Sequence, residues 1–334
     1  MSTSEIQVPT GRHLDPNSTV SDLLPALPAP REHDVVVVGD TGVDLMVRVD
    51  ALPGRDEKAI GEHLGVFGGG MGANFAVAAT RALPGARLAL VSRVGSDAFG
   101  RQCLADLEAR GVDTRHVHVE QGGVTWWCAV ALDATGEKAL LGARTPASLP
   151  RRTDVSLDLL QGTRLLHVLG DISFSAELID IARLHGALAS VDIEGSFVRD
   201  DTARARQLAT DADIVVTNAG GARGLTGFED PALAAADMLR VGVPGRARLV
   251  VLTLGSGGAL VVHGDGTGAW RALRQPARPV GVVDSTGAGD SFAGTFVACL
   301  LAGHPIGPTM ARAAEAAAVT LGVVGSRGAL LTTA

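Results

Sequence analysis

The sequence predicts a three-layer α/β fold, with a mainly parallel central sheet, helices on both of its faces and a small additional β-sheet. Short apolar segments alternate with helical segments along residues 34–330, as in parallel sheets whose strands are connected by helices. The first such segment, residues 35–38, is a run of valines, which is typical of a strand buried on both faces. Extended segments at about residues 45–66 and 120–141 interrupt the alternation and predict the additional sheet.

Residues 1–33 differ from the rest of the chain. They contain five prolines among polar and small residues and show no sustained apolar periodicity. Such a segment predicts a flexible N-terminal extension without chemistry of its own. We therefore expect one folded domain over residues 34–330.

Within that domain, the elements follow from local patterns. Helices are expected over 74–83 and 100–110, where apolar residues recur at helical spacing, with a strand at 88–91 between them. Further short apolar strands are expected at 165–169, 189–192, 214–217, 249–253 and 259–262. The two extended segments would pair with each other and form a lid over the site. Trp126 and Trp127 are consecutive, so on a strand they face opposite sides, one toward a pocket or both into packing contacts.

Composition and charge favour a small-molecule partner. With 46% hydrophobic residues, a net charge of -7 and no basic stripe, the chain predicts neither nucleic-acid binding nor attachment to an anionic membrane. The sequence contains no apolar run of about 20 residues without charges, so we expect no membrane-spanning helix, and no apolar leader is apparent. The three cysteines are far apart without metal-type spacing, which fits a reducing cytoplasm.

The strongest chemical motif lies at residues 284–290, before an apolar helix. Small residues at Gly287, Ala288 and Gly289 permit a tight turn, and NH groups at a helix start carry partial positive charge, so the motif predicts an anion site. Asp290 would lie in the first turn, where its carboxylate can accept a proton from an attacking hydroxyl. The alternative is a structural glycine-rich loop with an aspartate that stabilises the helix.

Three weaker motifs accompany it. Residues 68–74 place Gly70 and Asn74 before a helix, where the backbone approaches a ligand closely and an amide can bind hydroxyls; a degenerate dinucleotide fingerprint is the alternative. Asp44 follows the first strand, near the edge where ligands bind in open α/β sheets, unless it is an ordinary turn residue. Thr253, Gly255 and Gly258 form a glycine turn that could equally be a plain hairpin.

Taken together, in this order and spacing, these motifs resemble the ribokinase-like (PfkB) family of carbohydrate and nucleoside kinases over about residues 34–330. Residues 94–100, 111–114 and 133–137 are similar to further landmarks of that family. A Walker A loop is excluded, because neither lysine, Lys58 or Lys138, follows a glycine. The resemblance therefore implies a kinase that binds ATP and Mg²⁺, with K⁺ as a further cofactor of several members.

The resemblance also implies a role for each motif. Asp290 would be the general base, and the NH groups of Gly287, Ala288 and Gly289 would stabilise the charge that develops on the phosphoryl group. Asp44, Gly70 and Asn74 would hold sugar hydroxyls. The nucleotide side would be formed by Thr253, Gly255, Gly258 and Asn218, and the monovalent cation would lie at Asp284 and Thr286.

The chain departs from the family at two informative positions. The usual Asn-x-x-Glu motif, whose glutamate helps to organise magnesium, is here Asn218 to Gly221. Glu194, or Asp192 beside it, could supply the missing carboxylate, since Mg²⁺ takes few protein ligands. Met71 stands where ribokinases often have lysine, which weakens a strict ribokinase assignment.

Three functions remain open from the sequence. The first is ATP-dependent phosphorylation of a sugar or sugar derivative, and the second is a nucleoside kinase of the same family. The third, suggested by Gly221, is a catalytically weakened sugar-binding or regulatory protein. Exposed lid strands would favour a homodimer through the lid, because unpaired strand edges tend to be covered.

Overall fold

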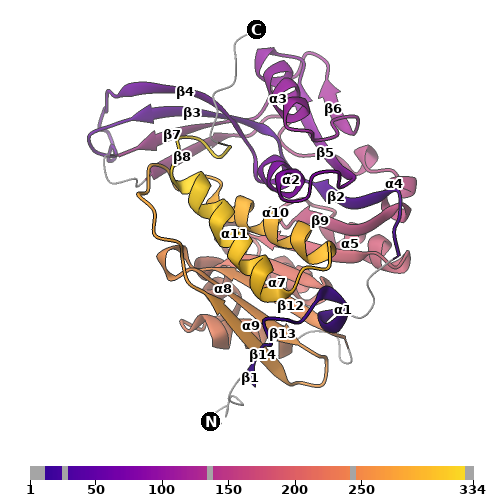
Figure 1. Ribbon diagram of the computed structural model, residues 1–334. Coiled ribbons are helices and arrows are strands. Elements are labelled where there is room, and N and C mark those ends of the chain that lie inside the picture. The colour runs from indigo at the N-terminus through magenta and orange to yellow at the C-terminus, as the bar shows by residue number, and fades with distance from the viewer. Residues whose placement is uncertain (1–11, 25–28, 134–137, 241–245, 328–334) are drawn as a thin grey trace.

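The computed structural model describes residues 12–24, 29–133, 138–240 and 246–327 (Figure 1). Predicted features at residues 1–11, 25–28, 134–137, 241–245 and 328–330 therefore lie outside the described residues. Within the described residues, no helix is both long enough and apolar enough to cross a membrane.

The large sheet has ten strands in the described part of the chain. Its order is β1-β14-β13-β12-β11-β10-β9-β2-β5-β6, and the strands from β12 to β6 run parallel. In that order the strands are Arg12–His13, Trp270–Gln275, Ala259–Gly264, Arg248–Thr253, Ile214–Asn218, Leu188–Ile193, Thr163–Leu169, His33–Val38, Leu88–Gly95 and Val117–Glu120. The predicted parallel α/β sheet is confirmed.

Both faces of this sheet are covered, as the valine run predicts. Val35 and Val37 pack into one hydrophobic cluster, while Val36 and Val38 pack into the other, because successive strand side chains point to opposite faces. The first face carries α1 (Val20–Leu23), α2 (Met71–Ala82), α3 (Ala98–Ala109), α10 (Ala288–Leu301) and α11 (Ile306–Leu321). The second carries α4 (Leu157–Gln161), α5 (Ser175–Leu184), α6 (Gly195–Asp200), α7 (Thr202–Asp211), α8 (Ala219–Thr226) and α9 (Pro231–Arg240).

The additional sheet is also confirmed. It consists of β4 (Glu62–Gly69), β3 (Gly42–Arg48), β7 (Trp127–Leu132) and β8 (Lys138–Ala143), in that order, and projects from the main body (Figure 1). A small core that includes Met46, Phe67 and Val130 holds it together. That it closes over the site as a lid stays a prediction.

Residues 12–24 differ from the expected flexible extension. Leu14 and Leu23 are 1% and 2% exposed, and both belong to the main core. The backbone carbonyls of Pro16 and Ser18 accept hydrogen bonds from the first residues of α11, at 2.8 Å each. Isolated apolar residues among prolines show no periodicity, so the local sequence gives no sign that they join the core.

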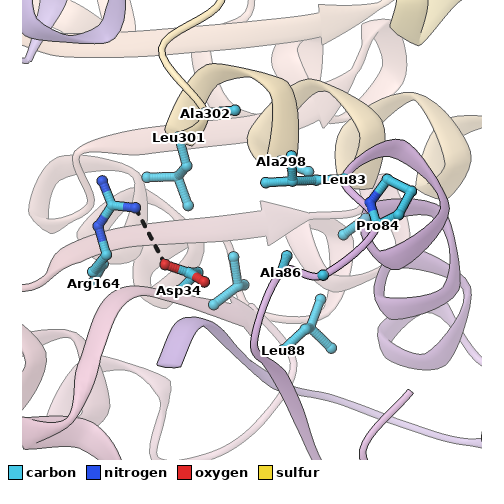
Figure 2. Close-up of a pocket in the computed structure, with 12 residues that line it drawn as sticks. Asp34, Leu83, Pro84, Ala86, Leu88, Arg164, Ala298, Leu301 and Ala302 are labelled. Atoms are coloured by element: carbon cyan, nitrogen blue, oxygen red, sulfur yellow. Dashed lines mark hydrogen bonds and ion pairs between the residues drawn. The ribbon is translucent and has the colours of Figure 1, made fainter. Parts of the chain in front are cut away.

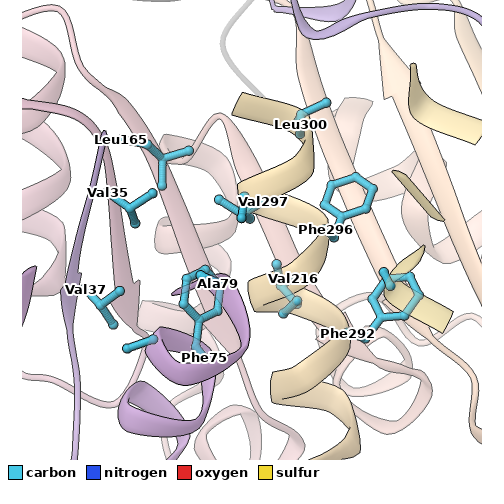
Figure 3. Packing of buried hydrophobic residues seen from close by; sticks show 14 of the residues in the cluster. Val35, Val37, Phe75, Ala79, Leu165, Val216, Phe292, Phe296, Val297 and Leu300 are labelled. Carbon is cyan, nitrogen blue, oxygen red and sulfur yellow. The ribbon is translucent and has the colours of Figure 1, made fainter. Parts of the chain in front are cut away.

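Side chains of α2 and α10 pack together against the central strands in the core (Figure 3). Phe296 of α10 is fully buried, and Phe75 of α2 stacks on His167 of β9 at a ring distance of 3.7 Å. Gly294 makes the close approach possible, since a Cβ there would lie 2.3 Å from the carbonyl oxygen of Phe75.

We expect Gly294→Ala to destabilise the protein. Alanine normally stabilises a helix interior by about 0.5–1 kcal/mol relative to glycine, but here its methyl group would push α10 away from the α2 backbone. We expect a net loss of about 1–3 kcal/mol in the free energy of unfolding, measured by urea denaturation. Gly289→Ala is the control, because among the described residues nothing lies within 4 Å of its added Cβ. Equal stabilisation by both variants would contradict the packing argument.

Candidate active site

A cavity of about 1250 Å³ lies at the carboxyl ends of the parallel strands, next to the additional sheet. Ligands bind at this edge in open α/β sheets because loops and helix starts converge there. The cavity lining includes most of the residues chosen from sequence: Asp44, Gly70, Asn74, Glu194, Asn218, Thr253, Gly255, Gly258, Thr286, Gly287, Ala288, Gly289 and Asp290. Asp284 lies behind the wall with 0% exposure.

The start of α10 forms one wall of the cavity. Gly287 is its N-cap with φ +75°, a conformation that favours glycine, and a Cβ there would lie 2.4 Å from Cβ of Ser326. The first helical hydrogen bond runs from the NH of Ser291 to the carbonyl of Gly287 at 2.9 Å. The NH groups before Ser291 therefore precede the helical ladder and are available to an anion.

Asp290 lies in the first turn of this helix. Its Oδ2 accepts a hydrogen bond of 2.8 Å from Nδ2 of Asn74, which lies in the first turn of α2. Desolvation raises the pKa of Asp290 to about 7, the Asn74 amide works against that rise, and the charge of Glu194 adds to it. A carboxyl group with this pKa can exchange protons near neutral pH.

Glycines let α2 begin at the cavity. A Cβ on Gly72 would lie 2.6 Å from Cα of Gly39, and a Cβ on Gly70, whose φ is +96°, would lie 2.8 Å from the carbonyl oxygen of Asp40. The NH of Gly72 donates to Oδ1 of Asp40 at 3.0 Å. The predicted glycine loop thus connects β4 to α2 and packs against Gly39 and Asp40, which follow β2 (His33–Val38).

Asp44 approaches the same region from β3 of the additional sheet. It is 5% exposed, and burial raises its pKa to about 6, partly offset by the positive charge of Arg327. The charge of Asp44 in turn raises the pKa of Asp290, so the two carboxyls interact. Gly70 and Asn74, which were chosen from residues 68–74, and Asp44, which was chosen from a separate stretch, therefore line the same cavity.

The glycine turn between β12 and β13 lines another part of the cavity. Residues Gly255–Gly257 form a short 3-10 turn, and Gly258 has φ +84°. A Cβ at Gly258 would lie 2.1 Å from the carbonyl oxygen of Gln275 in β14, so only glycine fits. The hairpin interpretation and the nucleotide-site interpretation are compatible, since the hairpin itself borders the cavity.

Asp284 ties the α10 loop to the end of the chain. Its Oδ1 accepts hydrogen bonds from the NH and the hydroxyl of Thr286 at 2.9 and 2.7 Å, and its Oδ2 accepts one from the NH of Gly325 at 2.9 Å. A cation here would share these oxygens with three donors. The monovalent-cation role of Asp284 and Thr286 stays a prediction.

Carboxyl groups gather at the strand ends on the floor of the cavity. Desolvation is the largest cause that raises the pKa values of Asp40, Asp171, Asp192 and Glu194, that of Asp40 to about 7. Repulsion by neighbouring carboxylates adds to the rise at Asp40, Asp192 and Glu194, whereas the charges of Arg144 and Arg204 oppose it at Asp171. Oδ1 of Asp171 is buried without a hydrogen-bond partner among the described residues. In that same part of the chain, no three His, Cys, Asp or Glu side chains form a ready metal cluster. These groups fit Mg²⁺ bound through few protein ligands and several waters.

Gly221 is built into its surroundings. A Cβ there would lie 2.2 Å from Oγ1 of Thr217, a fully buried hydroxyl that donates to the carbonyl of Ile193 at 2.5 Å. Asn218 caps α8 by accepting a hydrogen bond from the NH of Gly221 at 2.8 Å. A glutamate at 221 would clash here, whereas Glu194 lines the cavity one strand away.

Several cavity residues were missed at the sequence level. Nζ of Lys138, at the start of β8, donates to Oγ1 of Thr286 at 3.2 Å, and Arg144 also lines the cavity. Trp126 lines it too, which agrees with the alternative that one of the two tryptophans faces a pocket. Lys138 is one of only two lysines and lies in a predicted lid segment, which was an available signal. Asp40 and Asp171 each follow a strand, another usable signal. Trp127 packs into the core, opposite to Trp126.

A second, smaller cavity lies at the other end of α10 (Figure 2). It measures about 210 Å³ and is mostly apolar, and Asp34 and Arg164 in its wall pair with each other at 3.3 Å. Leu301 lines it at the end of the helix that Asp290 begins. The groups suited to chemistry belong to the larger cavity.

Comparison with known proteins agrees with this geometry. Residues 32–333 match the family described as pfkB family carbohydrate kinase. The chain is 33% identical over 278 residues to a 2-dehydro-3-deoxygluconokinase of Thermoproteus tenax, covering 78% of this chain and 81% of the relative. It is 27% identical over 311 residues to a ribokinase of Arabidopsis thaliana, covering 87% and 77%.

Solved structures share the fold. A putative ribokinase II of E. coli in complex with ATP and Mg²⁺ superimposes with a TM-score of 0.74 at 23% identity, covering 90% of this chain and 96% of that one. The chain therefore belongs to the pfkB family of carbohydrate kinases and is a phosphotransferase with an alcohol group as acceptor.

Proposed function

We propose that this protein transfers the γ-phosphoryl group of ATP to a hydroxyl group of a sugar or sugar derivative. The observation that carries the proposal is the position of Asp290 in the open first turn of α10, bonded to Asn74 on the sugar side. One group can thus take up the hydroxyl proton beside NH groups suited to a phosphate. This arrangement also argues against a weakened binding protein.

In the proposed reaction, the carboxylate of Asp290 accepts the proton of the substrate hydroxyl. The oxygen forms a bond to the γ-phosphorus while the bond from that phosphorus to the β-phosphate oxygen breaks, which releases ADP. The NH groups of Gly287, Ala288 and Gly289 stabilise the charge on the transferring group. Asp290 then releases its proton to solvent.

Lys138 adds a positive charge at the same place. It reaches Thr286 from the additional sheet, and its charge lowers the pKa values of Asp290 and Glu194. In a kinase, closure of this sheet over the acceptor would exclude water, which otherwise competes for the phosphoryl group. A homodimer through the exposed edge strand β8, where Leu141 is 70% exposed, stays a prediction.

Glu194 and Asp192 would hold Mg²⁺ in place of the family glutamate, with Asn218 nearby on the nucleotide side. Bound Mg²⁺ neutralises phosphate charge and orients the phosphates. Thr253, Gly255 and Gly258 would border the nucleotide. K⁺ at Asp284 and Thr286 is part of the same proposal.

The acceptor would bind between Asp44, Gly70 and Asn74. Asp44 and the Asn74 amide suit hydroxyl groups, since together they offer acceptors and donors. Trp126, which lines the cavity, favours a nucleoside acceptor as the second candidate, because its ring can stack on a base. A substrate panel separates the two.

We expect Asp290→Asn to lower kcat about 10²–10⁴-fold, because the amide cannot accept the proton. ADP release with ATP, Mg²⁺ and K⁺ is measured across sugars, sugar acids and nucleosides. Asp265→Asn is the matched control and should keep the wild-type rate, because Asp265 is exposed and does not line the cavity. A fully active, folded Asp290→Asn protein would disprove the assigned base, and turnover confined to nucleosides would favour the second candidate.

The pH dependence should follow the pKa of Asp290. Below about 7 the carboxyl group is protonated and cannot act as a base, so kcat/KM should rise through that pH and level off above it. Initial rates between about pH 5.5 and 9 at constant ionic strength test this. A rate that is already maximal at the acid end would show that another group limits the reaction.

Glu194→Gln should raise the Mg²⁺ concentration needed for half-maximal rate about 10-fold, since one anionic ligand is removed. Magnesium titrations at fixed ATP measure this, with the exposed Glu177→Gln on α5 as control. An unchanged magnesium curve in Glu194→Gln would assign the metal to other carboxylates.

A further inference from the structure

The side chain of Arg327 is buried beneath the glycine loop although it lies near the end of the chain. It is 1% exposed, and its Nη1 donates to Oδ2 of Asp106 on α3 at 2.8 Å. Its Nη2 donates to the carbonyl of Gly69 at 2.7 Å, and its Nε donates to Oδ1 of Asn74 at 2.9 Å. One guanidinium group thus joins α3, the glycine loop and the residue that contacts Asp290.

These contacts determine which way the Asn74 amide faces. An arginine can only donate hydrogen bonds, so the atom of the amide that faces Arg327 must be the oxygen. The NH₂ group then faces Asp290, where it donates at 2.8 Å. Ser326 also contacts Oδ1 of Asn74, at 3.0 Å, but a hydroxyl can donate or accept and would tolerate either orientation.

The opposite orientation would be unfavourable for a base. It would place the amide oxygen against the carboxylate oxygen of Asp290, and two acceptors repel each other unless the carboxyl group is protonated. Other charges that act on Asp290 come from Glu194 after β10, Lys138 of β8 and Asp44 of β3, while Asp40 and Asp192 also interact with it. None of these groups contacts the amide of Asn74 in the described residues.

We propose that Arg327 is a positioning residue for phosphoryl transfer: it holds the Asn74 amide with its NH₂ group toward Asp290, so that the base keeps its lone pairs for the substrate hydroxyl. This inference rests on the proposed function for its effect on rate. The amide orientation itself can be measured without any substrate.

The experiment compares Arg327→Met, which removes the donor, with Arg327→Lys, which keeps a group that can only donate. Arg110→Met is the matched control, because Arg110 contacts the same Asp106 carboxylate at 2.8 Å and the carbonyl of Arg327 but, within the described residues, makes no hydrogen bond to Asn74. We expect Arg327→Met to lower kcat about 10–100-fold and Arg327→Lys to recover most of that loss. Arg110→Met should lower the melting temperature with kcat within about twofold of wild type.

A double-mutant comparison with Asn74→Ala distinguishes a positioning role of Arg327 from a merely structural one. If Arg327 acts through the amide, Arg327→Met should cost nothing further in kcat when it is added to Asn74→Ala. The acidic limb of the pH profile of kcat should also move to higher pH in Arg327→Met but stay in place in Arg110→Met. Fully additive losses, or an equal loss of kcat in Arg110→Met, would overturn the inference.

A substrate-free measurement distinguishes failure of this inference from failure of the proposed function. The side-chain amide signal of Asn74, assigned in ¹H–¹⁵N spectra by its loss in Asn74→Ala, should shift in Asp290→Asn because its partner changes. It should keep the wild-type position in Arg327→Lys and move in Arg327→Met. An unchanged signal in Arg327→Met overturns the inference, whereas moved signals without kinase turnover uphold it and contradict the proposed function.

Discussion

The site depends on two helices from distant parts of the chain that begin at the same point. The 2.8 Å bond between Asn74 and Asp290 joins the first turns of α2 and α10 across 216 residues of sequence. Close packing behind it holds the two helices in register, since Gly294 lies directly against the backbone of Phe75. Interiors packed at this density shift little, so the positions of amide and carboxylate follow from the core.

Electrostatics sets the second constraint. Asp40, Asp44, Asp290 and Glu194 line one cavity, and burial raises the pKa of each carboxyl group. Positive counterparts come from elsewhere in the fold: the first NH groups of α10 and Lys138 of the additional sheet. A cavity of this character disfavours further negative charge unless a cation accompanies it, which fits a nucleotide taken up together with Mg²⁺. Burial, with repulsion from Glu194 and Asp44 as a smaller cause, keeps the pKa of Asp290 near 7, where the carboxyl group can exchange protons.

Local patterns predicted more of the fold than of the site. The valine run at 35–38 predicts a buried strand, and the glycines around Gly70 and Gly287 predict tight turns. Each of these patterns can be recognised within a few consecutive residues. The replacement of the family glutamate at Gly221 was visible too, but not its cause, because the hydroxyl of Thr217 occupies the space only once β11 and α8 are packed together. Residues 12–24 were misjudged for a similar reason, since Leu14 and Leu23 join a core built by distant segments, and α11 donates hydrogen bonds to the carbonyls of Pro16 and Ser18.

The sequence by itself determined the parallel α/β architecture, the additional sheet and the glycine loops, and it singled out Asp290 as the candidate base. These features depend on local periodicity, turn chemistry and motif spacing. Only the tertiary structure decided which groups act on that carboxylate. Asn74, Lys138 and Arg327 reach the site from three separate parts of the chain, and no pattern near any of them predicts the others. Hydrogen bonds extend only about 3 Å, so such partnerships exist only after the whole chain has packed.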